Sequence, residues 1–220
     1  LVLGVVALCL TGLALAIALP DRGAARETAP RAQAGALDLS GWDFAKDGSV
    51  SLAGEWRYFD GRWASDIDGA TPATMAVPGR TSSFDAEAVA RAHGFATYAL
   101  TMRLPRTPAE PLAIETGYFY SAYRVYANGT LIAQSGVPSA TAEGESARVY
   151  SKFALLPVGV ETIELRYEVS NHLRSFRGSL AAPRVGLESA IAGHRNWVAA
   201  FSLLLVGAML FAAIYHFVVV

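Results

Sequence analysis

Apolar residues concentrate at the two ends of the chain, and polar residues fill the part between them. Leu1 to Leu19 is a 19-residue run without charge, and Trp197 to Val220 is a 24-residue run with no charge and one histidine, His216. Every Lys, Arg, Asp and Glu lies between Asp21 and Arg195. A hydrocarbon core about 30 Å thick needs roughly 20 apolar helical residues. The second run therefore predicts a membrane-spanning helix, which makes the lipid bilayer a partner of the chain.

The first apolar run has two interpretations. It is either a signal peptide, with small residues Ala16 and Ala18 ahead of a cleavage point, or an uncleaved signal anchor. Both send the polar middle out of the cytoplasm. We therefore expect residues 37–187 in the periplasm or outside the cell, held at a bacterial inner (cytoplasmic) membrane. Because the chain begins without Met and stops inside an apolar run, we also expect it to be a piece of a longer protein.

Between the apolar ends, hydrophobic residues alternate with period two. One alternating segment is 98–104, and a second is 162–170, where Ile163, Leu165, Tyr167 and Val169 share one face. A pleated strand places such residues on one side, whereas a helix would scatter them. A third segment, 118–127, leads through Asn128-Gly129 into 130–134, which predicts a β-hairpin with a type I′ turn.

Shorter apolar stretches recur between turn residues, and they raise the expected total to about eight or nine strands. They are Ser51-Leu52 and residues 55–59, 73–77, 112–115 and 148–155. The pattern predicts a mainly β fold, a jelly-roll β-sandwich flanked by the N-terminal signal or anchor segment and the C-terminal membrane helix. Inside it, only 84–93 suggests a short helix.

These patterns also predict the domain boundaries. Residues 1–19 form the signal peptide or anchor, and 20–36, rich in Ala, Arg, Glu and Pro, form a flexible linker. Residues 37–187 form the sandwich, 188–196 a connecting turn or helix, and 197–220 the membrane helix.

Composition excludes several classes of function. The net charge is −1 and no basic block is present, whereas nucleic-acid binding needs clustered Lys and Arg. Cys9 is the only cysteine, so neither an internal disulfide nor a cysteine metal site can form. His93 and His172 have no Cys or His neighbours at metal-ligand spacing. We expect no metal site, no cofactor and, in the absence of any nucleophile elbow or phosphate loop, no catalytic residues in this fragment.

Two resemblances rest on short motifs. The first is to the jelly-roll sugar-binding domain that precedes the barrel of β-galactosidases and β-glucuronidases. The motifs are Leu52-Ala-Gly54-Glu-Trp56, a tyrosine-bearing strand from Ala96 to Pro105, and a strand closing at Asn128-Gly129. This likeness is to an accessory domain, so it implies sugar binding and no reaction.

The second resemblance covers nearly the whole chain. It is to the N-terminal part of bacterial seven-transmembrane receptors with diverse intracellular signalling modules. The shared motifs are Leu37-Asp-Leu39-Ser-Gly-Trp42, Gly54-Glu-Trp56-Arg-Tyr58, Gly94-Phe-Ala-Thr97-Tyr98, Ser121-Ala-Tyr123-Arg124-Val-Tyr-Ala-Asn128-Gly129, Val169-Ser170-Asn171 and the helix segment Gly207 through His216. It implies an extracytoplasmic sensor, seven membrane helices and a cytoplasmic output module such as a diguanylate cyclase or histidine kinase. The chain departs from the pattern after Val77-Pro78, where a Trp is often found.

Candidate ligand-binding residues lie in two places. Tyr118, Phe119 and Tyr120 precede the hairpin strand, and one or two of them must face outward; Arg124 follows within that strand. The other place is the polar loop after the last clear strand, with Asn171, His172, Arg174 and Arg177, since arginine offers a fixed fork of donors to a hydroxylated or anionic ligand. Loop capping is the alternative interpretation there. For Trp42, Trp56 and Tyr58, core packing competes with sugar stacking.

The leading hypothesis is a periplasmic sensor domain that couples ligand binding to a membrane helix bundle, with a carbohydrate or carboxylated small molecule as ligand. The alternative is an accessory carbohydrate-binding domain of a membrane-tethered glycan-processing enzyme. A domain that mediates homodimer formation is a third option. The role of His216 stays open, because ionisable residues inside membranes are costly and often functional.

Overall fold

The computed structural model of the chain describes residues 29–81, 93–106, 110–173 and 177–219. The chain divides into two units. One unit is Ala25–Ile191, and the other combines Leu1–Ala24 with Ala192–Val220. The predicted helix at 84–93 and the signal segment at 1–19 lie outside the described residues, apart from His93.

The strands of Ala25–Ile191 form three sheets. The largest has seven strands in the order β10-β9-β12-β6-β3-β4, with β1 added parallel to β6. Its strands are β1 (Ala36–Asp38), β3 (Gly54–Asp60), β4 (Ala73–Val77), β6 (Gly94–Arg103), β9 (Ala122–Ala127), β10 (Thr130–Ser135) and β12 (Thr162–Asn171).

The two smaller sheets have the orders β11-β7-β14-β2 and β5-β13-β8. Their strands are β2 (Val50–Ser51), β5 (Gly79–Thr81), β7 (Leu112–Glu115), β8 (Tyr118–Tyr120), β11 (Phe153–Leu155), β13 (Arg177–Ala181) and β14 (Arg184–Leu187). The helical elements among the described residues are α2 (Phe44–Asp47), the 3-10 turn η1 (Ala64–Asp66) and α4 (Glu188–Val219).

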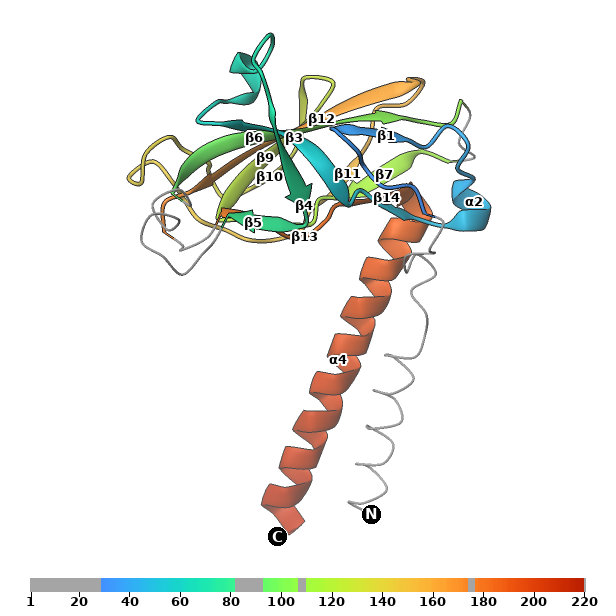
Figure 1. Cartoon of the computed structure of the whole chain (residues 1–220). Helices are drawn as coiled ribbons and strands as arrows, with labels where there is room; N and C mark the ends of the chain where they lie inside the picture. The colour runs from blue at the N-terminus through green and yellow to red at the C-terminus, as the bar shows by residue number, and fades with distance from the viewer. Residues whose placement is uncertain (1–28, 82–92, 107–109, 174–176, 220) are drawn as a thin grey trace. The chain divides into compact units, whose positions relative to one another are not determined.

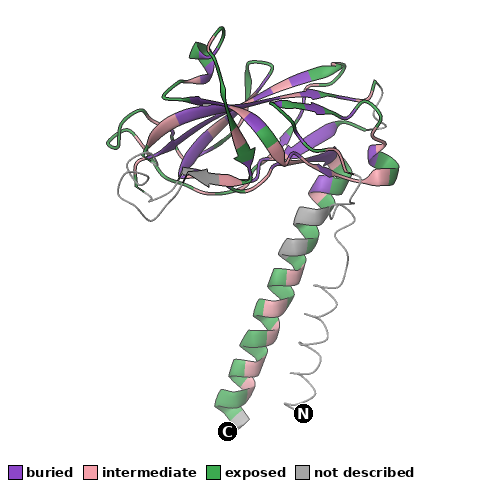
Figure 2. Ribbon diagram, viewed as in Figure 1, coloured by how far each residue is buried: buried purple, intermediate pink, exposed green. Residues whose placement is uncertain are grey.

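The sheets stack as two layers, with the seven-stranded sheet on one side and the two smaller sheets on the other (Figure 1). The predicted mainly β, jelly-roll-like sandwich is therefore confirmed. Buried residues line the strands between the layers, and exposed ones gather in the loops (Figure 2).

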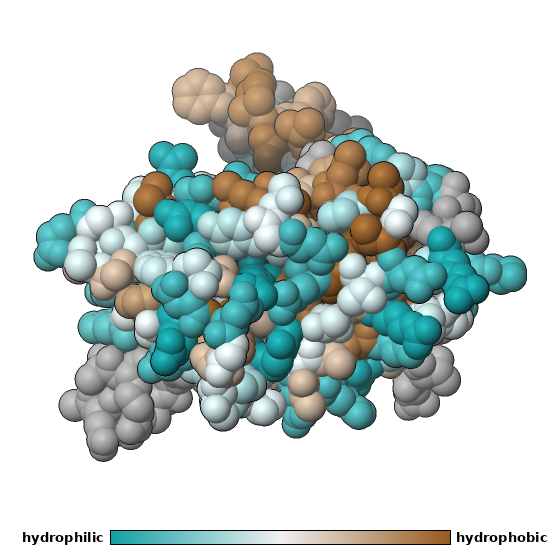
Figure 3. Space-filling view, turned by 90° about the horizontal axis from the view of Figure 1, so that it is seen from above, coloured by the Kyte–Doolittle hydropathy of each residue, from teal (hydrophilic) through white to brown (hydrophobic). Residues whose placement is uncertain are grey.

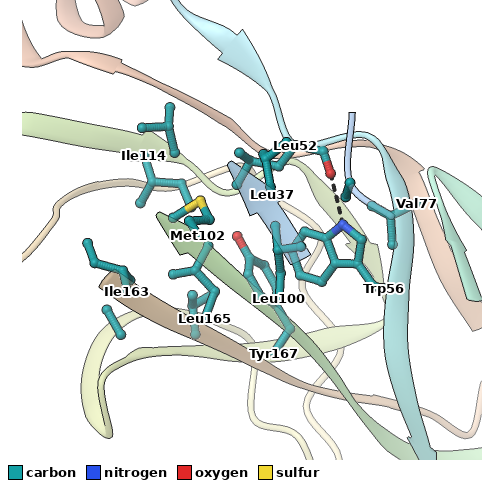
Figure 4. Packing of buried hydrophobic residues seen from close by; sticks show 14 of the residues in the cluster. Leu37, Leu52, Trp56, Val77, Leu100, Met102, Ile114, Ile163, Leu165 and Tyr167 are labelled. Atoms are coloured by element: carbon teal, nitrogen blue, oxygen red, sulfur yellow. Dashed lines mark hydrogen bonds between the residues drawn. The ribbon is translucent and has the colours of Figure 1, made fainter. Parts of the chain in front are cut away.

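Large aromatic and aliphatic side chains fill the space between the layers. Trp56, Tyr98 and Tyr167 are fully buried. Trp56 meets Tyr167 edge-on at 5.5 Å, and its indole N–H donates to the Leu52 carbonyl at 2.8 Å (Figure 4). A buried indole usually needs such a partner. Trp56 is therefore a core residue, which excludes its ring from sugar stacking; Tyr58 is also buried.

The alternating segments form the strands that they predict. The inward set of β12 is fully buried, and Tyr98, Leu100 and Met102 of β6 are buried as well. The outward positions differ from expectation, because Ala99 of β6 packs under Phe59 and Ile67 in a second small cluster. Loop residues thus cover part of the outer face of the larger sheet.

The hairpin at Asn128-Gly129 is confirmed. The φ angles are 49° at Asn128 and 79° at Gly129, both positive as a type I′ turn requires. The Asn128 side chain also accepts from the Glu164 backbone N–H at 2.8 Å, which ties the turn to β12.

The flexible linker predicted over residues 20–36 is wrong for its last part. Ala32 is 2% exposed, its N–H donates to the Ala53 carbonyl at 3.0 Å, and its carbonyl accepts from Glu55 N–H at 2.9 Å. Gly54 makes this crossing possible: a Cβ there would lie 2.1 Å from the Ala32 oxygen, and its φ is +138°. Backbone pairing of this kind is invisible to composition, which alone suggested a linker.

Charged side chains pair across the outer face of the larger sheet. Arg57 of β3 bonds Glu164 of β12 at 3.0 Å, and Arg166 bonds Asp68 at 2.7 Å. Seen from this side, hydrophilic residues dominate most of the domain surface (Figure 3).

The C-terminal helix α4 runs without interruption from Glu188 to Val219. Its segment Ala200–Val218 has 19 residues, none of them buried, and among the described residues it is the one helix long and apolar enough to cross a membrane. At 1.5 Å per residue it is about 28 Å long, close to the thickness of a hydrocarbon core.

Candidate functional site

A carboxylate from the loop between β10 and β11 joins three segments at one end of the sandwich. Glu145 accepts hydrogen bonds from the hydroxyls of Ser121, which precedes β9, and of Ser170 in β12, the latter at 2.5 Å. The backbone N–H of His172 also donates to it, at 3.4 Å. We refer to Ser121, Ser139, Glu145, Ser170 and His172 as the Glu145 cluster.

Ser139 completes the cluster from the same loop. Its N–H donates to the Ser170 hydroxyl oxygen at 3.1 Å, and its carbonyl lies 3.1 Å from His172 Nε2. Because a carbonyl only accepts, the Nε2 nitrogen of His172 must carry the proton in this contact. These mutual bonds attach the loop to the ends of β9 and β12.

The candidates of the polar loop are in different environments. His172 is half-buried in the Glu145 cluster, whereas Asn171 is fully buried at the end of β12 and pairs with Gly94 of β6. The backbone of Arg177, in β13, pairs with that of Thr81 in β5. Arg174 lies outside the described residues. The side chain of His172 is partly accessible.

Arg124 contacts a buried carboxylate. It bonds Glu168 at 3.1 Å and reaches the Pro138 carbonyl at 3.4 Å. Glu168 is 5% exposed and also accepts from the Ala64 N–H and the Tyr126 hydroxyl. Burial, followed by the negative charge of Glu168, raises the pKa of Tyr126. The Arg124 guanidinium thus balances the buried charge of Glu168. The sequence alone did not predict this role, since it suggested Arg124 as a ligand-binding residue.

The three aromatic residues of β8 divide between the two faces of their sheet. Phe119 is fully buried and lies 4.7 Å from the Tyr167 ring, while Tyr118 is 45% exposed and Tyr120 is half-buried. Two of the three aromatic residues therefore face away from the core.

A directional chain of hydrogen bonds links Tyr123 and Thr116 to the loop that carries Tyr150 and Lys152. Tyr123 donates its hydroxyl to the Tyr150 carbonyl, so the 2.6 Å contact between Tyr123 and Thr116 must have the Thr116 hydroxyl as donor. Thr116 in turn accepts from the Lys152 N–H at 2.8 Å. Burial is the main cause that raises the pKa of Tyr123 to about 12.

Sequence reasoning missed Glu145, Ser121 and Ser170 in the Glu145 cluster. It also missed Tyr150 and Lys152, whose backbone groups bond Tyr123 and Thr116. The segment 148–155 was predicted as a strand, but only Phe153–Leu155 is one. Residues 148–152 instead form a hydrogen-bonded loop, in which 62% of the surface of Tyr150 is exposed. In the described part of the chain, no three His, Cys, Asp or Glu residues gather as metal ligands would.

Comparison with known proteins gives structural likenesses only. No protein-family model matches the chain, and no curated protein matches it either. Among solved structures, β-glucuronidase from Ruminococcus gnavus is 16% identical with a TM-score of 0.46, over 62% of this chain and 28% of that enzyme. β-Glucuronidase from Faecalibacterium prausnitzii is 23% identical with a TM-score of 0.43, over 57% of this chain and 21% of that enzyme. The chain thus corresponds to less than a third of either enzyme.

Proposed function

We propose that this chain is an extracytoplasmic carbohydrate-binding module fixed to a membrane helix, and that it acts as the sensor domain of a bacterial membrane receptor. The observation that carries the proposal is the direct junction between sandwich and helix. β14 ends at Leu187 and α4 begins at Glu188, with no residue between them. A movement of β14 therefore reaches the helix without a flexible segment.

The first turn of α4 is held by the β-domain. Its Glu188 N–H donates to the Pro111 carbonyl at 2.9 Å, and Ile191 is 6% exposed. An ideal Cβ on Gly186 would lie 3.3 Å from the Ile191 side chain, so Ile191 packs close to β14. Such a junction lets a ligand that prefers one arrangement of the sandwich bias the helix toward one of two states.

The receptor interpretation also draws on the motifs that resemble seven-transmembrane receptors. It requires further membrane helices and a cytoplasmic output module after Val220. The enzymatic or kinase activity of such a module would belong to that part of the protein and not to this chain.

A second candidate is the accessory carbohydrate-binding domain of a membrane-tethered glycan-processing enzyme. It is favoured by the Leu52-Ala-Gly54-Glu-Trp56 motif, in which the Trp56 indole bonds the Leu52 carbonyl and Gly54 admits the crossing of Ala32. The motif resembles that of sugar-binding jelly rolls attached to glycosidases. Here the junction with α4 would act as a tether and would transmit nothing.

Thermal unfolding of the whole chain in lipid nanodiscs tests binding. The panel is galactose, glucuronate, galacturonate and citrate. A ligand at 100 times its Kd adds about 2.7 kcal/mol, which corresponds to a Tm increase of roughly 5–10 °C for a domain of this size. If no compound shifts the Tm while dimers form with rising concentration, the module mediates assembly and the proposal is wrong.

A fluorescent probe on Asn196→Cys, in a Cys9→Ala background, separates the two candidates. A sensor predicts that a bound sugar changes the probe's emission, and that a flexible ten-residue insertion after Leu187 removes this change but leaves the Tm shift. An accessory domain predicts a Tm shift without any change at the probe.

A further inference from the structure

Two tyrosines and a lysine outside the Glu145 cluster form an exposed group around one buried phenol. Tyr150 is 62% exposed and Tyr118 is 45% exposed. The Tyr123 hydroxyl bonds the Tyr150 carbonyl, and the N–H of Thr116, two residues before Tyr118, donates to the Lys152 carbonyl at 2.9 Å. We call Tyr118, Tyr150 and Lys152 the aromatic platform.

The backbone that presents Tyr150 is fixed, although its ring is exposed. Its N–H donates to the Ser135 hydroxyl oxygen at 3.1 Å, and that hydroxyl donates to the Arg148 carbonyl at 3.0 Å. With its own carbonyl also bonded, Tyr150 has both backbone groups satisfied by the sandwich. Because the backbone is already fixed, only the side-chain torsions of Tyr150 remain to be ordered when a ligand binds.

Lys152 brings a positive charge to the same place. Its ammonium lies 5.9 Å from the centre of the Tyr150 ring, within the range of a cation–π contact. None of the ion pairs among the described residues involves Lys152, which is exposed. Its charge is therefore available to an external anion.

We infer that the aromatic platform binds an acidic glycan, one that contains uronic-acid residues. The tyrosine rings offer flat apolar faces for the C–H side of a sugar ring, and their hydroxyls can bond sugar hydroxyls. The Lys152 ammonium would pair with the uronate carboxylate. This inference rests on the proposed carbohydrate-binding function and adds to it a place and a ligand class.

Calorimetric titration of the whole chain in nanodiscs tests the inference, with tetragalacturonate and neutral galactotetraose as probes. We expect tetragalacturonate to bind more tightly. Tyr150→Ala should weaken its binding about tenfold, equivalent to about 1.4 kcal/mol. Lys152→Met should remove the preference for the acidic probe, and Tyr118→Ala should weaken the binding of both probes. Leu131→Ala, a change at a residue 49% exposed elsewhere, is the matched control and should change nothing.

Three outcomes would overturn the inference. Tetragalacturonate could bind the Tyr150→Ala and Lys152→Met variants as tightly as wild type, which would put the sugar site elsewhere and leave the proposed function standing. Equal affinity for the acidic and neutral probes would exclude the ligand class. No binding of tetragalacturonate would exclude the platform, while the panel of small sugars decides the proposed function separately. Unchanged Tm values would show that the variants fold.

Discussion

Several polar side chains of this sandwich are buried, and burial and hydrogen bonding set their protonation and their contribution to stability. Tyr123 and Tyr167 have phenol groups inside the core, and burial raises the pKa of both. Period-two alternation placed Tyr167 inward, but it could not show which hydroxyls, carbonyls and carboxylates would meet. Glu168 illustrates the limit: alternation puts it on the outer face, and it is buried there because the Ala64 N–H and Arg124 contact it.

The raised pKa of Tyr123 predicts a loss of stability in alkali. Between pH 10 and about 12 the unfolded chain releases the Tyr123 proton while the folded chain retains it. The unfolded state then binds fewer protons, so the free energy of unfolding falls by about 1.4 kcal/mol per pH unit from this group. Urea unfolding of wild type and Tyr123→Phe at pH 9 to 12 checks this. We expect a shallower decline for the variant, and identical slopes would exclude the assignment.

Among the loop residues of the Glu145 cluster, we expect substitution of Glu145 to lower the free energy of unfolding most. Glu145→Ala leaves the hydroxyls of Ser121 and Ser170 without their acceptor, which should cost about 1–3 kcal/mol of unfolding free energy. Glu143→Ala, an exposed neighbour in the same loop, is the control and should cost less than about 0.5 kcal/mol. Chemical denaturation measures both, and equal effects would mean that the cluster does not hold the loop.

Among the elements, local patterns predicted most strands but, apart from the hairpin, not which strands pair. The hairpin followed from Asn128-Gly129, because the turn depends on two adjacent residues that accept positive φ. The N-terminal crossing at Ala32 depends on a distant glycine, Gly54, and no local window contains both. For the same reason, the local pattern predicts a strand over 148–155, whereas the backbone of the loop 148–152 bonds the side chains of Ser135, Tyr123 and Thr116.

Substitution of Gly54 tests whether the crossing of Ala32 requires a residue without a side chain at position 54. Gly54→Ala brings a Cβ to 2.1 Å from the Ala32 oxygen at a φ of +138°, so it should cost about 3 kcal/mol or more. Gly61→Ala provides the control, because its φ is +62° and a Cβ there meets nothing within 4 Å; about 1 kcal/mol is expected. Denaturation midpoints compare the two. Similar losses would show that the segment at Ala32 can move away.

The molecule as a whole combines a β-sandwich with a helix that is long and apolar enough to cross a membrane. The sequence predicted both parts, since a 24-residue apolar run and period-two alternation are strong signals. The candidate ligand-binding residues that it predicted lie in different environments. Asn171 is buried in β12 and Arg124 is paired with Glu168, whereas Tyr150 and Lys152, which no motif singled out, are exposed.

We propose that the sandwich lies outside the cytoplasm, held by its membrane helix, and labelling of a single cysteine tests this topology. In a Cys9→Ala background, Ala147→Cys places a thiol at an exposed loop position, and Ala113→Cys places one in the buried core as a control. A membrane-impermeant maleimide added to intact spheroplasts should label Ala147→Cys fully and should leave Ala113→Cys unlabelled until the protein is denatured. Labelling of Ala147→Cys only after lysis would contradict the account.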